Sequence, residues 1–329
     1  MKEELRDRKI RFQCDRCGRM LRSPEAHAGR PGKCTCGHHV VVPFPYENPN
    51  EENPLRGHCL AGCRIDSVMG KGSTATVYKA HHLALDIPVV IKILEIPEGE
   101  SDPKAGDRFL EEAKIVARLH HPNVVDVINA GEENGHTFIV SRFALGTSLG
   151  KMIRRKEQIR IRRLFRIFLD VCSALRSAHR RSVLHGDVKP DHILITPQWR
   201  AILIDFGLVG NLRDYEDEVQ DRRAIGTPLY MSPERAKGEH GYDFRSDIYS
   251  LGATMYHAFS GQPPFEGASI VDVLRKHAEE PLIPLVRVSP RVPLELSDIV
   301  TRAMDKDPDE RFQSVDELRD ELRALCYLQ

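Results

Sequence analysis

Two short turns that carry carboxylates follow apolar segments in the middle of this chain. Residues 164–178 have the apolar spacing of a mostly buried helix, and the turn after them places Asp187 two residues before Lys189. The apolar strand predicted at 201–205 ends in Asp205, beside a Phe-Gly pair whose glycine is flexible. Carboxylate oxygens are the ligands that Mg²⁺ prefers, so the second turn is a candidate magnesium site.

A glycine-rich segment and a lysine in an apolar strand precede these turns. Residues 70–77 hold glycines that let a backbone approach phosphates and direct N–H groups at them. Glycine pairs usually mark ordinary turns, so alone this segment is weak support for nucleotide binding. Lys92 lies in the strand predicted at 89–94, where a charge is costly without a partner. Glu112, on the helix predicted at 108–119, is a candidate for that partner.

In this order and spacing the motifs resemble the protein kinase family, over about residues 59–329. Further segments that match the family pattern are His121–Val125, Gly226–Met231, Ser232–Glu234, Ser246–Gly252 and Asp307–Phe312. Ordinary turns and core residues do not account for so many matches in one order. The resemblance implies a small strand-rich lobe, a larger helical lobe and the use of ATP and Mg²⁺.

The resemblance also implies a role for each residue of the site. Lys92, oriented by Glu112, would hold the α- and β-phosphates, and Asp205 would bind Mg²⁺. Asp187 would orient the substrate hydroxyl and accept its proton, while Lys189 would neutralise charge on the γ-phosphoryl group. The nucleotide would be held by Gly70, Lys71, Gly72, Ser73, Val77, Lys92, Ser141, Phe143, Ala144 and Asp205.

Other matches concern the acceptor and the helical lobe. Lys189 and Thr227 follow the pattern of Ser/Thr kinases, so the resemblance implies that protein Ser and Thr hydroxyls accept the phosphoryl group. Glu234 would pair with Arg311, which is a structural role.

The chain departs from the family pattern at three places in the site. The third glycine of the loop is Ala75, whose methyl group we expect to be tolerated. The metal-binding asparagine of the catalytic loop is replaced by His192, and imidazole is a poor Mg²⁺ ligand. The second metal site is therefore expected to be weak, to prefer Mn²⁺ or to use Asp191. Alternatively, His192 simply hydrogen-bonds to Asp187 or to the backbone.

The third departure concerns phosphorylation. The residue before Asp187 is Gly186, where many kinases have an arginine that pairs with a phosphorylated activation segment. Residues 208–225 contain no Ser or Thr, and only Tyr215 there carries a hydroxyl. We therefore hypothesise that activity does not need phosphorylation of this stretch, unless Thr227 is the site.

Four of the eight cysteines crowd into the first 36 residues: Cys14, Cys17, Cys34 and Cys36. A glycine follows each second cysteine and permits a tight turn around a metal-bound sulfur. The segment resembles short zinc ribbons, and it is too small to fold on a hydrophobic core alone. The second pair is Cys-x-Cys, which weakens the match, and His38 or His39 is an alternative ligand. The competing interpretation is free thiols in a disordered arm.

The zero net charge of the chain hides two unlike parts. Residues 1–43 hold 10 Lys+Arg against 5 Asp+Glu, and residues 44–329 hold 38 against 43. A basic head could bind nucleic acid, but it has no interleaved aromatic platform, so we favour an unidentified regulatory protein partner. A second basic run is either a solvated helix face or a dock for acidic substrates, and comprises Lys151, Arg154, Arg155, Lys156, Arg160, Arg162, Arg163 and Arg166.

These observations predict an α+β chain in three parts. They are a zinc-ribbon-like head at 1–43, a Pro- and Asn-rich linker at 44–58 and a two-lobed kinase domain at 59–329. Within that domain we expect the N-lobe to span 59–143 and the C-lobe 144–329. Without a signal peptide or a membrane-length apolar run, we expect a cytoplasmic protein that binds no membrane.

The predicted function is ATP-dependent transfer of a phosphoryl group to protein Ser/Thr hydroxyls. One alternative is a pseudokinase, a nucleotide-binding scaffold whose Ala75 and His192 have removed useful turnover. Intact Lys92, Asp187 and Asp205 argue against that alternative. A small-molecule kinase is a second alternative, because His-Gly-Asp loops also occur in antibiotic-kinase relatives. The substrate, the input signal and the oligomeric state do not follow from the sequence.

Overall fold

The computed structural model describes residues 9–14, 16–24, 31–41, 55–72, 75–95, 105–206, 228–239 and 241–328. Several predictions concern positions outside these described residues. They are the linker up to residue 54, the loop residue Ser73, and the stretch 207–227 with Tyr215 and Thr227.

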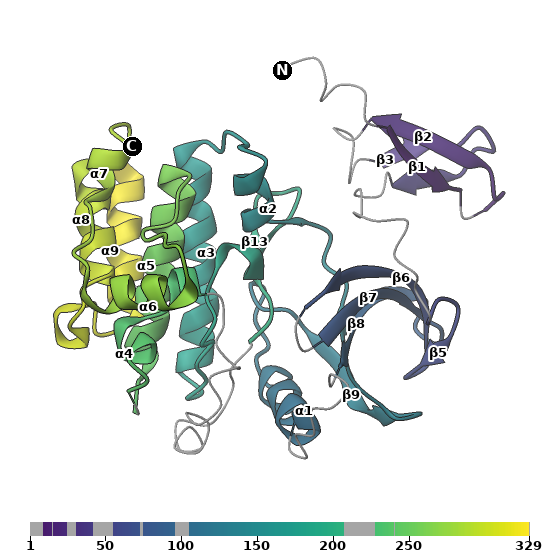
Figure 1. Ribbon diagram of the computed structural model, residues 1–329. Coiled ribbons are helices and arrows are strands. Elements are labelled where there is room, and N and C mark those ends of the chain that lie inside the picture. The colour runs from purple at the N-terminus through teal and green to yellow at the C-terminus, as the bar shows by residue number, and fades with distance from the viewer. Residues whose placement is uncertain are drawn as a thin grey trace.

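The N-terminal head consists of two small antiparallel sheets, drawn in purple in Figure 1. Strand β1 pairs with β2, and β3 pairs with β4. The strands are β1 Lys9–Gln13, β2 Met20–Pro24, β3 Pro31–Lys33 and β4 His39–Val41. Their small core contains Cys14, Cys34 and Val40, with Leu21 packed against it. Such a core is too small to stabilise a fold without a further cross-link.

A six-stranded antiparallel sheet follows, in the order β5-β6-β7-β8-β10-β9. Its strands are β5 Cys59–Leu60, β6 Cys63–Lys71, β7 Ala75–His82, β8 Ile87–Leu94, β9 Val127–Glu133 and β10 His136–Arg142. Strand β8 alternates strictly, because Val89, Ile91 and Ile93 are buried on one face. Lys92 therefore faces the other side of the sheet.

Helix α1, Ala105–Val116, packs on that other side of the sheet. Its buried residues Phe109, Ala113 and Val116 recur at helical spacing and form one apolar stripe. Phe109 and Ala113 share a cluster with Ala75 and Ile139 of the sheet. The methyl group of Ala75, at the position of the third loop glycine, is thus 4% exposed and packs into the core. This agrees with the expectation that a methyl group is tolerated there.

The rest of the described chain is mostly helical and encloses the largest core, seen on the left of Figure 1. A three-stranded sheet of β11 Thr147–Ser148, β12 Ile193–Ile195 and β13 Ala201–Leu203 lies against it. The helices are α2 Leu149–Arg154, α3 Ile161–His179, η3 Pro190–His192, η5 Pro228–Tyr230, α4 Pro233–Ala236, α5 Phe244–Ser260, α6 Ile270–Glu279, α7 Leu285–Val288, α8 Leu294–Ala303, η6 Pro308–Glu310 and α9 Val315–Leu328.

Helix α5 forms the centre of this helical part. Asp243 caps its N-terminus by accepting from the Arg245 amide, and Gly261 ends it in the left-handed conformation with φ +79°. Eleven consecutive residues from Ser246 to Tyr256 are buried, so the helix is enclosed on all sides. The predicted two-lobed α+β arrangement is confirmed for the described residues from 55 onward.

Hydrogen bonds join the segment after α1 to the small sheet of the helical part. Asn123 donates from Nδ2 to the carbonyl of Ala201 at 2.7 Å, and its own carbonyl accepts from the Leu203 amide at 2.8 Å. Val124 also forms a parallel bridge with Leu203. The end of β13, where Asp205 follows, is therefore held next to the strand-rich part.

Candidate active site

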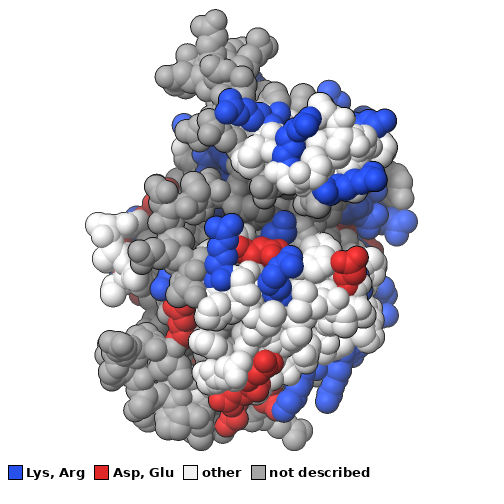
Figure 2. Space-filling view, turned by 90° about the vertical axis from the view of Figure 1, so that its right-hand side faces the viewer, with Lys and Arg blue, Asp and Glu red and all other residues white. Residues whose placement is uncertain are grey.

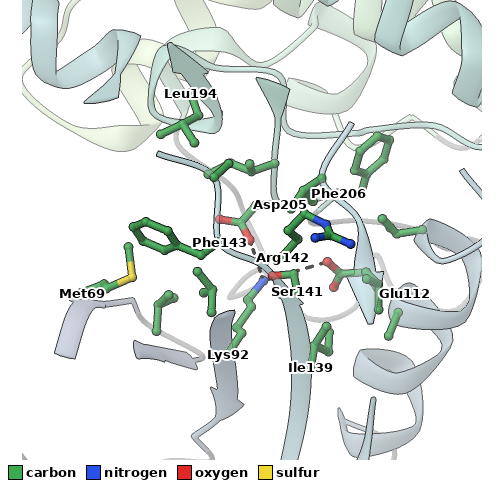
Figure 3. Close-up of a pocket in the computed structure, with 18 of the residues that line it drawn as sticks. Met69, Lys92, Glu112, Ile139, Ser141, Arg142, Phe143, Leu194, Asp205 and Phe206 are labelled. Carbon is green, nitrogen blue, oxygen red and sulfur yellow. Dashed lines mark hydrogen bonds and ion pairs between the residues drawn. The ribbon is translucent and has the colours of Figure 1, made fainter. Parts of the chain in front are cut away.

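A cavity of about 180 Å³ lies between the six-stranded sheet and the helical part (Figure 3). Val77, Lys92 and Ile139 line it from the sheet, and Leu194 and Asp205 line it from the helical part. The lining is mainly apolar with a few convergent charges, as in sites that bind a flat organic ring next to a charged group.

Lys92 points into this cavity from β8 with only 23% of its side chain exposed. Its Nζ lies 3.3 Å from Oδ1 of Asp205 and 3.9 Å from Oε1 of Glu112. Burial alone would lower the pKa of Lys92, but the two carboxylates outweigh burial and raise it. The lysine is therefore a fixed cation, and the predicted pairing of Lys92 with Glu112 is present beside a closer contact with Asp205.

The two carboxylates beside Lys92 differ in their electrostatics. Burial raises the pKa of Glu112 to about 7, although the charge of Lys92 opposes this. For Asp205, burial also acts to raise the pKa, but the nearer Lys92 charge outweighs it and lowers the pKa to about 2. Asp205 is thus the firmly ionised carboxylate of the pair. It has φ +53°, which explains why the strand predicted to reach residue 205 already ends at Leu203.

The loop after α3 carries Asp187 and Lys189, the two residues expected to act on the hydroxyl and on the γ-phosphoryl group. Lys189 Nζ donates to Oδ2 of Asp187 at 2.5 Å, so the two charges neutralise one another at the edge of the site. Asp247 of α5 holds the loop from beneath, accepting from the amides of His185 and Gly186 at 2.9 and 2.8 Å. Gly186 has φ +71°, in the left-handed region that favours glycine.

His192 lies between the two carboxylates of the site. Its Nδ1 donates to the backbone carbonyl of Asp187 at 3.0 Å, which leaves the lone pair on Nε2. That Nε2 lies 3.8 Å from Oδ2 of Asp205. Burial lowers the pKa of His192, despite the neighbouring carboxylates. The bonding to the Asp187 backbone that we weighed as an alternative is present, and it also directs Nε2 at Asp205.

The end of β10 and the residues that follow it also line the cavity. Ser141, Phe143 and Ala144 all border it, and they are among the residues that the resemblance implied would hold the nucleotide. In the glycine-rich segment, the Gly72 amide donates to the carbonyl of Ala75 at 2.8 Å. Lys71 forms an exposed ion pair with Glu95, the residue after β8, and its Nζ lies 3.2 Å from Oε2 of that glutamate.

The four clustered cysteines converge in the head. Cys14 and Cys36 have their sulfurs 3.7 Å apart, as do Cys17 and Cys34, and all four sulfurs lie within 4.8 Å of one another. Bonds of about 2.3 Å to a tetrahedral zinc ion place two sulfurs about 3.8 Å apart, so the set fits zinc. The glycines after each pair adopt φ +68° and +86°, the tight turns that the sequence predicted. Four sulfurs complete the set without His38 or His39.

Comparison with known proteins identifies the family. The sequence model of one protein family, described as “Protein kinase domain”, matches residues 63–321. The chain belongs to the protein kinase family.

Among the relatives of this kinase, the probable serine/threonine-protein kinase CPE1738 of Clostridium perfringens is 34% identical over 257 residues. The serine/threonine-protein kinase PknB of Mycolicibacterium smegmatis is 36% identical over 263 residues, and pkn3 of Myxococcus xanthus is 35% identical over 272. The matches cover 78%, 78% and 80% of this chain, but only 37%, 42% and 49% of the relatives. The chain thus spans less than half of each of these proteins.

One of the open alternatives for the second metal site is less favourable in this structure. Asp191 was a candidate to support the second metal, but both of its carboxylate oxygens accept hydrogen bonds from Arg154, at 2.8 and 2.9 Å. A cation bound at Asp205 would have to compete with Arg154 for the carboxylate oxygens of Asp191. His192 is therefore the candidate ligand that remains of the two.

Three residues that contact the loop from His185 to Asp191 were not assigned to the site from the sequence: Asp247, Arg235 and Arg154. Asp247 lies in the segment Ser246–Gly252, whose match to the family pattern was a signal for it. The pairing of Glu234 with Arg311 was predicted and is confirmed, with bonds of 3.0 and 2.8 Å.

The basic run along α2, the following loop and the start of α3 is largely solvent-facing. Seven of its eight residues are exposed, all except Lys151. Arg163 stacks on Trp199 at 3.9 Å from the ring centroid. In the described part of the chain, no helix combines the length and apolarity needed to cross a bilayer.

Proposed function

We propose that this chain is an ATP-dependent Ser/Thr protein kinase that transfers the γ-phosphoryl group to protein hydroxyls. One observation carries the proposal: Lys92 and Asp205 line one mainly apolar cavity, and His192 lies within 4 Å of both Asp205 and the Asp187 that pairs with Lys189. The adenine would lie against Phe143 and Ala144. The curated relatives bear the same activity in their names, which supports the proposal.

The chain's own residues divide the work of phosphoryl transfer. Lys92, held by Glu112, would bind the α- and β-phosphates, and the segment Gly70–Gly72 with Ser73 would cover them. Asp187 would hold the attacking hydroxyl and accept its proton, and Lys189 beside it would offset charge on the γ-phosphoryl group. This chemistry relies on positioning and electrostatics, which the ion pairs of the site provide.

Asp205 is the residue that would hold Mg²⁺. Its carboxylate stays ionised at neutral pH, with a pKa lowered to about 2, and oxygen donors suit this cation. When bound, the metal supplies positive charge to the β- and γ-phosphates.

A second cation would bind between Asp205 and His192. Their atoms Oδ2 and Nε2 lie 3.8 Å apart. Two bonds of about 2.1 Å from one cation span at most about 4.2 Å, so a shared cation fits. Imidazole favours transition metals over Mg²⁺, and we therefore propose that Mn²⁺ is preferred at this position.

Binding of Mn²⁺ tests this assignment directly. With ADP present, nitrogen coupling in the electron spin resonance spectrum of bound Mn²⁺ should disappear in His192→Asn. It should persist in the control His136→Asn, whose histidine is half-buried at the start of β10. The ratio of Mn²⁺ to Mg²⁺ affinity should fall about tenfold in His192→Asn. Equal spectra and ratios in the wild type and His192→Asn would contradict the assignment.

The acceptor assay separates the proposed function from its alternatives. The chain is incubated with γ-labelled ATP and a peptide library that offers Ser, Thr or Tyr, and in parallel with small-molecule alcohols. Label on Ser or Thr peptides supports a protein kinase. Nucleotide binding without any transfer supports the pseudokinase, which no observation in the described residues favours. Transfer to alcohols alone supports a small-molecule kinase.

We further propose that the head is a structural zinc ribbon that binds an unidentified regulatory protein. The geometry of its four sulfurs supports the metal. Arg16, Arg19, Arg22 and Lys33 are exposed on it, and Figure 2 shows Lys and Arg side chains over the upper part of the molecule where the head lies. This surface suits an acidic protein partner. Because the reaction needs ATP and the thiols need reducing conditions, we place the chain in the cytoplasm.

A further inference from the structure

Arg235 of α4 reaches the loop that carries Asp187. Its Nη1 donates a hydrogen bond to the backbone carbonyl of Gly186. The guanidinium also lies 5.3 Å from the centroid of the Tyr242 ring, which limits its orientation. Arg235, Gly186 and Asp187 line the same small cleft. The side chain thus contacts the peptide group directly before the proposed catalytic carboxylate.

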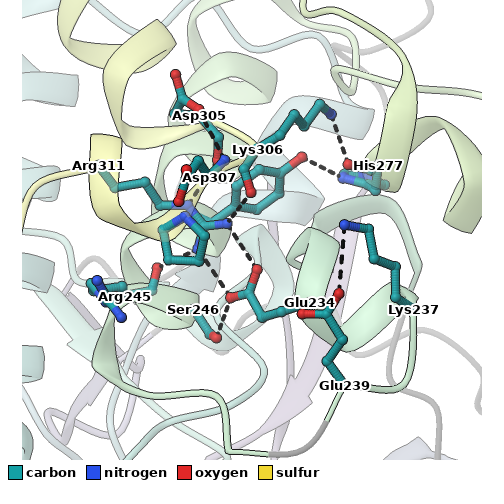
Figure 4. A network of polar contacts seen from close by, with 12 residues as sticks. Glu234, Lys237, Glu239, Arg245, Ser246, His277, Asp305, Lys306, Asp307 and Arg311 are labelled. Atoms are coloured by element: carbon teal, nitrogen blue, oxygen red, sulfur yellow. Dashed lines mark hydrogen bonds and ion pairs between the residues drawn. The ribbon is translucent and has the colours of Figure 1, made fainter.

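Helix α4 is a rigid base for this contact. Glu234, the preceding residue, accepts two hydrogen bonds from Arg311 and a third from Ser246, as Figure 4 shows. Both Arg311 and Glu234 are almost completely buried, at 0% and 8% side-chain exposure. An ion pair of this kind fixes the backbone of α4, so Arg235 projects from a position that is set by the core.

The peptide between Gly186 and Asp187 is bound at both of its polar atoms. Its carbonyl accepts from Arg235, and its N–H donates to Nδ1 of His185 at 3.2 Å. Asp247 binds the preceding peptide by accepting from the Gly186 amide. Rotation of the Gly186–Asp187 peptide would break a charge-assisted hydrogen bond, so the direction of the Asp187 side chain is restricted.

The glycine at position 186 makes such an anchor necessary. Glycine adopts φ +71° without steric cost, but it also has the greatest backbone freedom of all residues. This kinase has no arginine at position 186 with which to tie the loop to a phosphorylated segment. Arg235 donates to the loop from outside, and this contact does not depend on phosphorylation.

We propose that Arg235 is a positioning residue that holds the Gly186–Asp187 peptide, and with it the Asp187 carboxylate, in the orientation needed for phosphoryl transfer. The proposal rests on the proposed kinase function. It adds a contact that takes the place of the arginine that many kinases have directly before this aspartate. It requires no modification of the chain.

Two variants of Arg235 and one control test the proposal. Arg235→Ala removes the donor, Arg235→Lys keeps the charge, and Lys237→Ala changes an exposed residue at the end of the same helix. In Arg235→Ala, kcat should fall about ten- to hundredfold, with KM for ATP and for peptide changed less than about twofold. Arg235→Lys should recover part of kcat, and the control should match the wild type.

Hydrogen exchange gives a readout that does not need turnover. The amide of Asp187 should exchange faster in Arg235→Ala than in the wild type, while the amides of α5 keep their protection. If no protein, the wild type included, transfers phosphate, the kinase proposal fails, and hydrogen exchange still decides whether Arg235 holds the loop.

Three results would overturn the role of Arg235. They are an unchanged kcat in Arg235→Ala, a loss confined to KM, or unchanged exchange at the Asp187 amide. An equal loss of protection in α5 would also overturn it, because Arg235 would then stabilise the fold instead of positioning the loop.

Discussion

The buried pair of Glu234 and Arg311 permits a quantitative prediction about stability. Glu234→Gln leaves the Arg311 guanidinium, which has no exposed side-chain surface, without a counter-charge. Removing one partner of a buried pair costs about 3 to 5 kcal/mol. Burial alone would raise the pKa of Glu234, but the bonds and charge of Arg311 lower it from 4.5 to about 2. At about 1.4 kcal/mol per pKa unit, this shift corresponds to about 3 kcal/mol. The value from the pKa shift thus agrees with the general cost of breaking a buried pair.

Urea unfolding followed by the fluorescence of Trp199 measures this effect. Trp199 is the single tryptophan of the chain and packs on Arg163 of α3, so it reports on the helical lobe. Glu234→Gln and Arg311→Met should each lower the free energy of unfolding by about 3 to 5 kcal/mol. Glu239→Gln is the matched control, because its ion pair with Lys237 is about half exposed and contributes at most about 1 kcal/mol.

The double variant and the pH dependence can refute the reasoning. Glu234→Gln with Arg311→Met should cost clearly less than the sum of the single variants, since the second change removes the stranded charge. The folded pKa of Glu234 lies below its unfolded value. Its contribution is therefore complete above about pH 5 and is lost as the pH falls toward 2. Additive single effects, or a difference between wild type and Glu234→Gln that does not shrink below pH 5, would contradict this account.

Two further predictions concern zinc and phosphorylation. The purified chain should contain one zinc ion, and Cys14→Ser should abolish it and unfold the head while the urea transition of the helical lobe stays unchanged; less than a tenth of an equivalent of zinc in the wild type would contradict this. Complete dephosphorylation by a phosphatase should leave kcat within about twofold, because Arg235 anchors the catalytic loop without a phosphate. A loss that Thr227→Ala reproduces would show instead that the segment needs its phosphate.

The sequence predicted those features of the site that depend on neighbouring residues in one element or on a specific order of motifs. The alternation of β8 places Lys92 opposite Val89, Ile91 and Ile93. Its charge required a partner, and Glu112 lies within reach at 3.9 Å, although Asp205 is the nearer one at 3.3 Å. Apolar spacing predicted a strand at 201–205 and a helix at 164–178, and the structure has them at 201–203 and 161–179. Their boundaries were less accurate, because the positive φ of Asp205 ends its strand early.

Contacts between distant segments that no family motif implies were beyond the sequence, unlike the pairing of Glu234 with Arg311. Asp191 is sequentially close to His192, but only the fold shows that Arg154 binds it with both donors. The bond from Arg235 to Gly186 depends on the direction in which α4 projects, which no periodicity encodes. The Cys-x-Cys spacing appeared unfavourable, yet the tighter turn from the Gly37 amide to the Cys34 carbonyl lets Cys36 reach the other sulfurs.

The central claim is that Asp187 directs the hydroxyl in a working Ser/Thr kinase. The most direct measurement compares γ-phosphoryl transfer to a Ser/Thr peptide by the wild type and by Asp187→Asn, with Mg²⁺ or Mn²⁺ and at saturating ATP. The wild type should transfer phosphate, and Asp187→Asn should lose about a hundredfold or more of kcat while still binding nucleotide. Equal transfer by the two proteins would contradict the account.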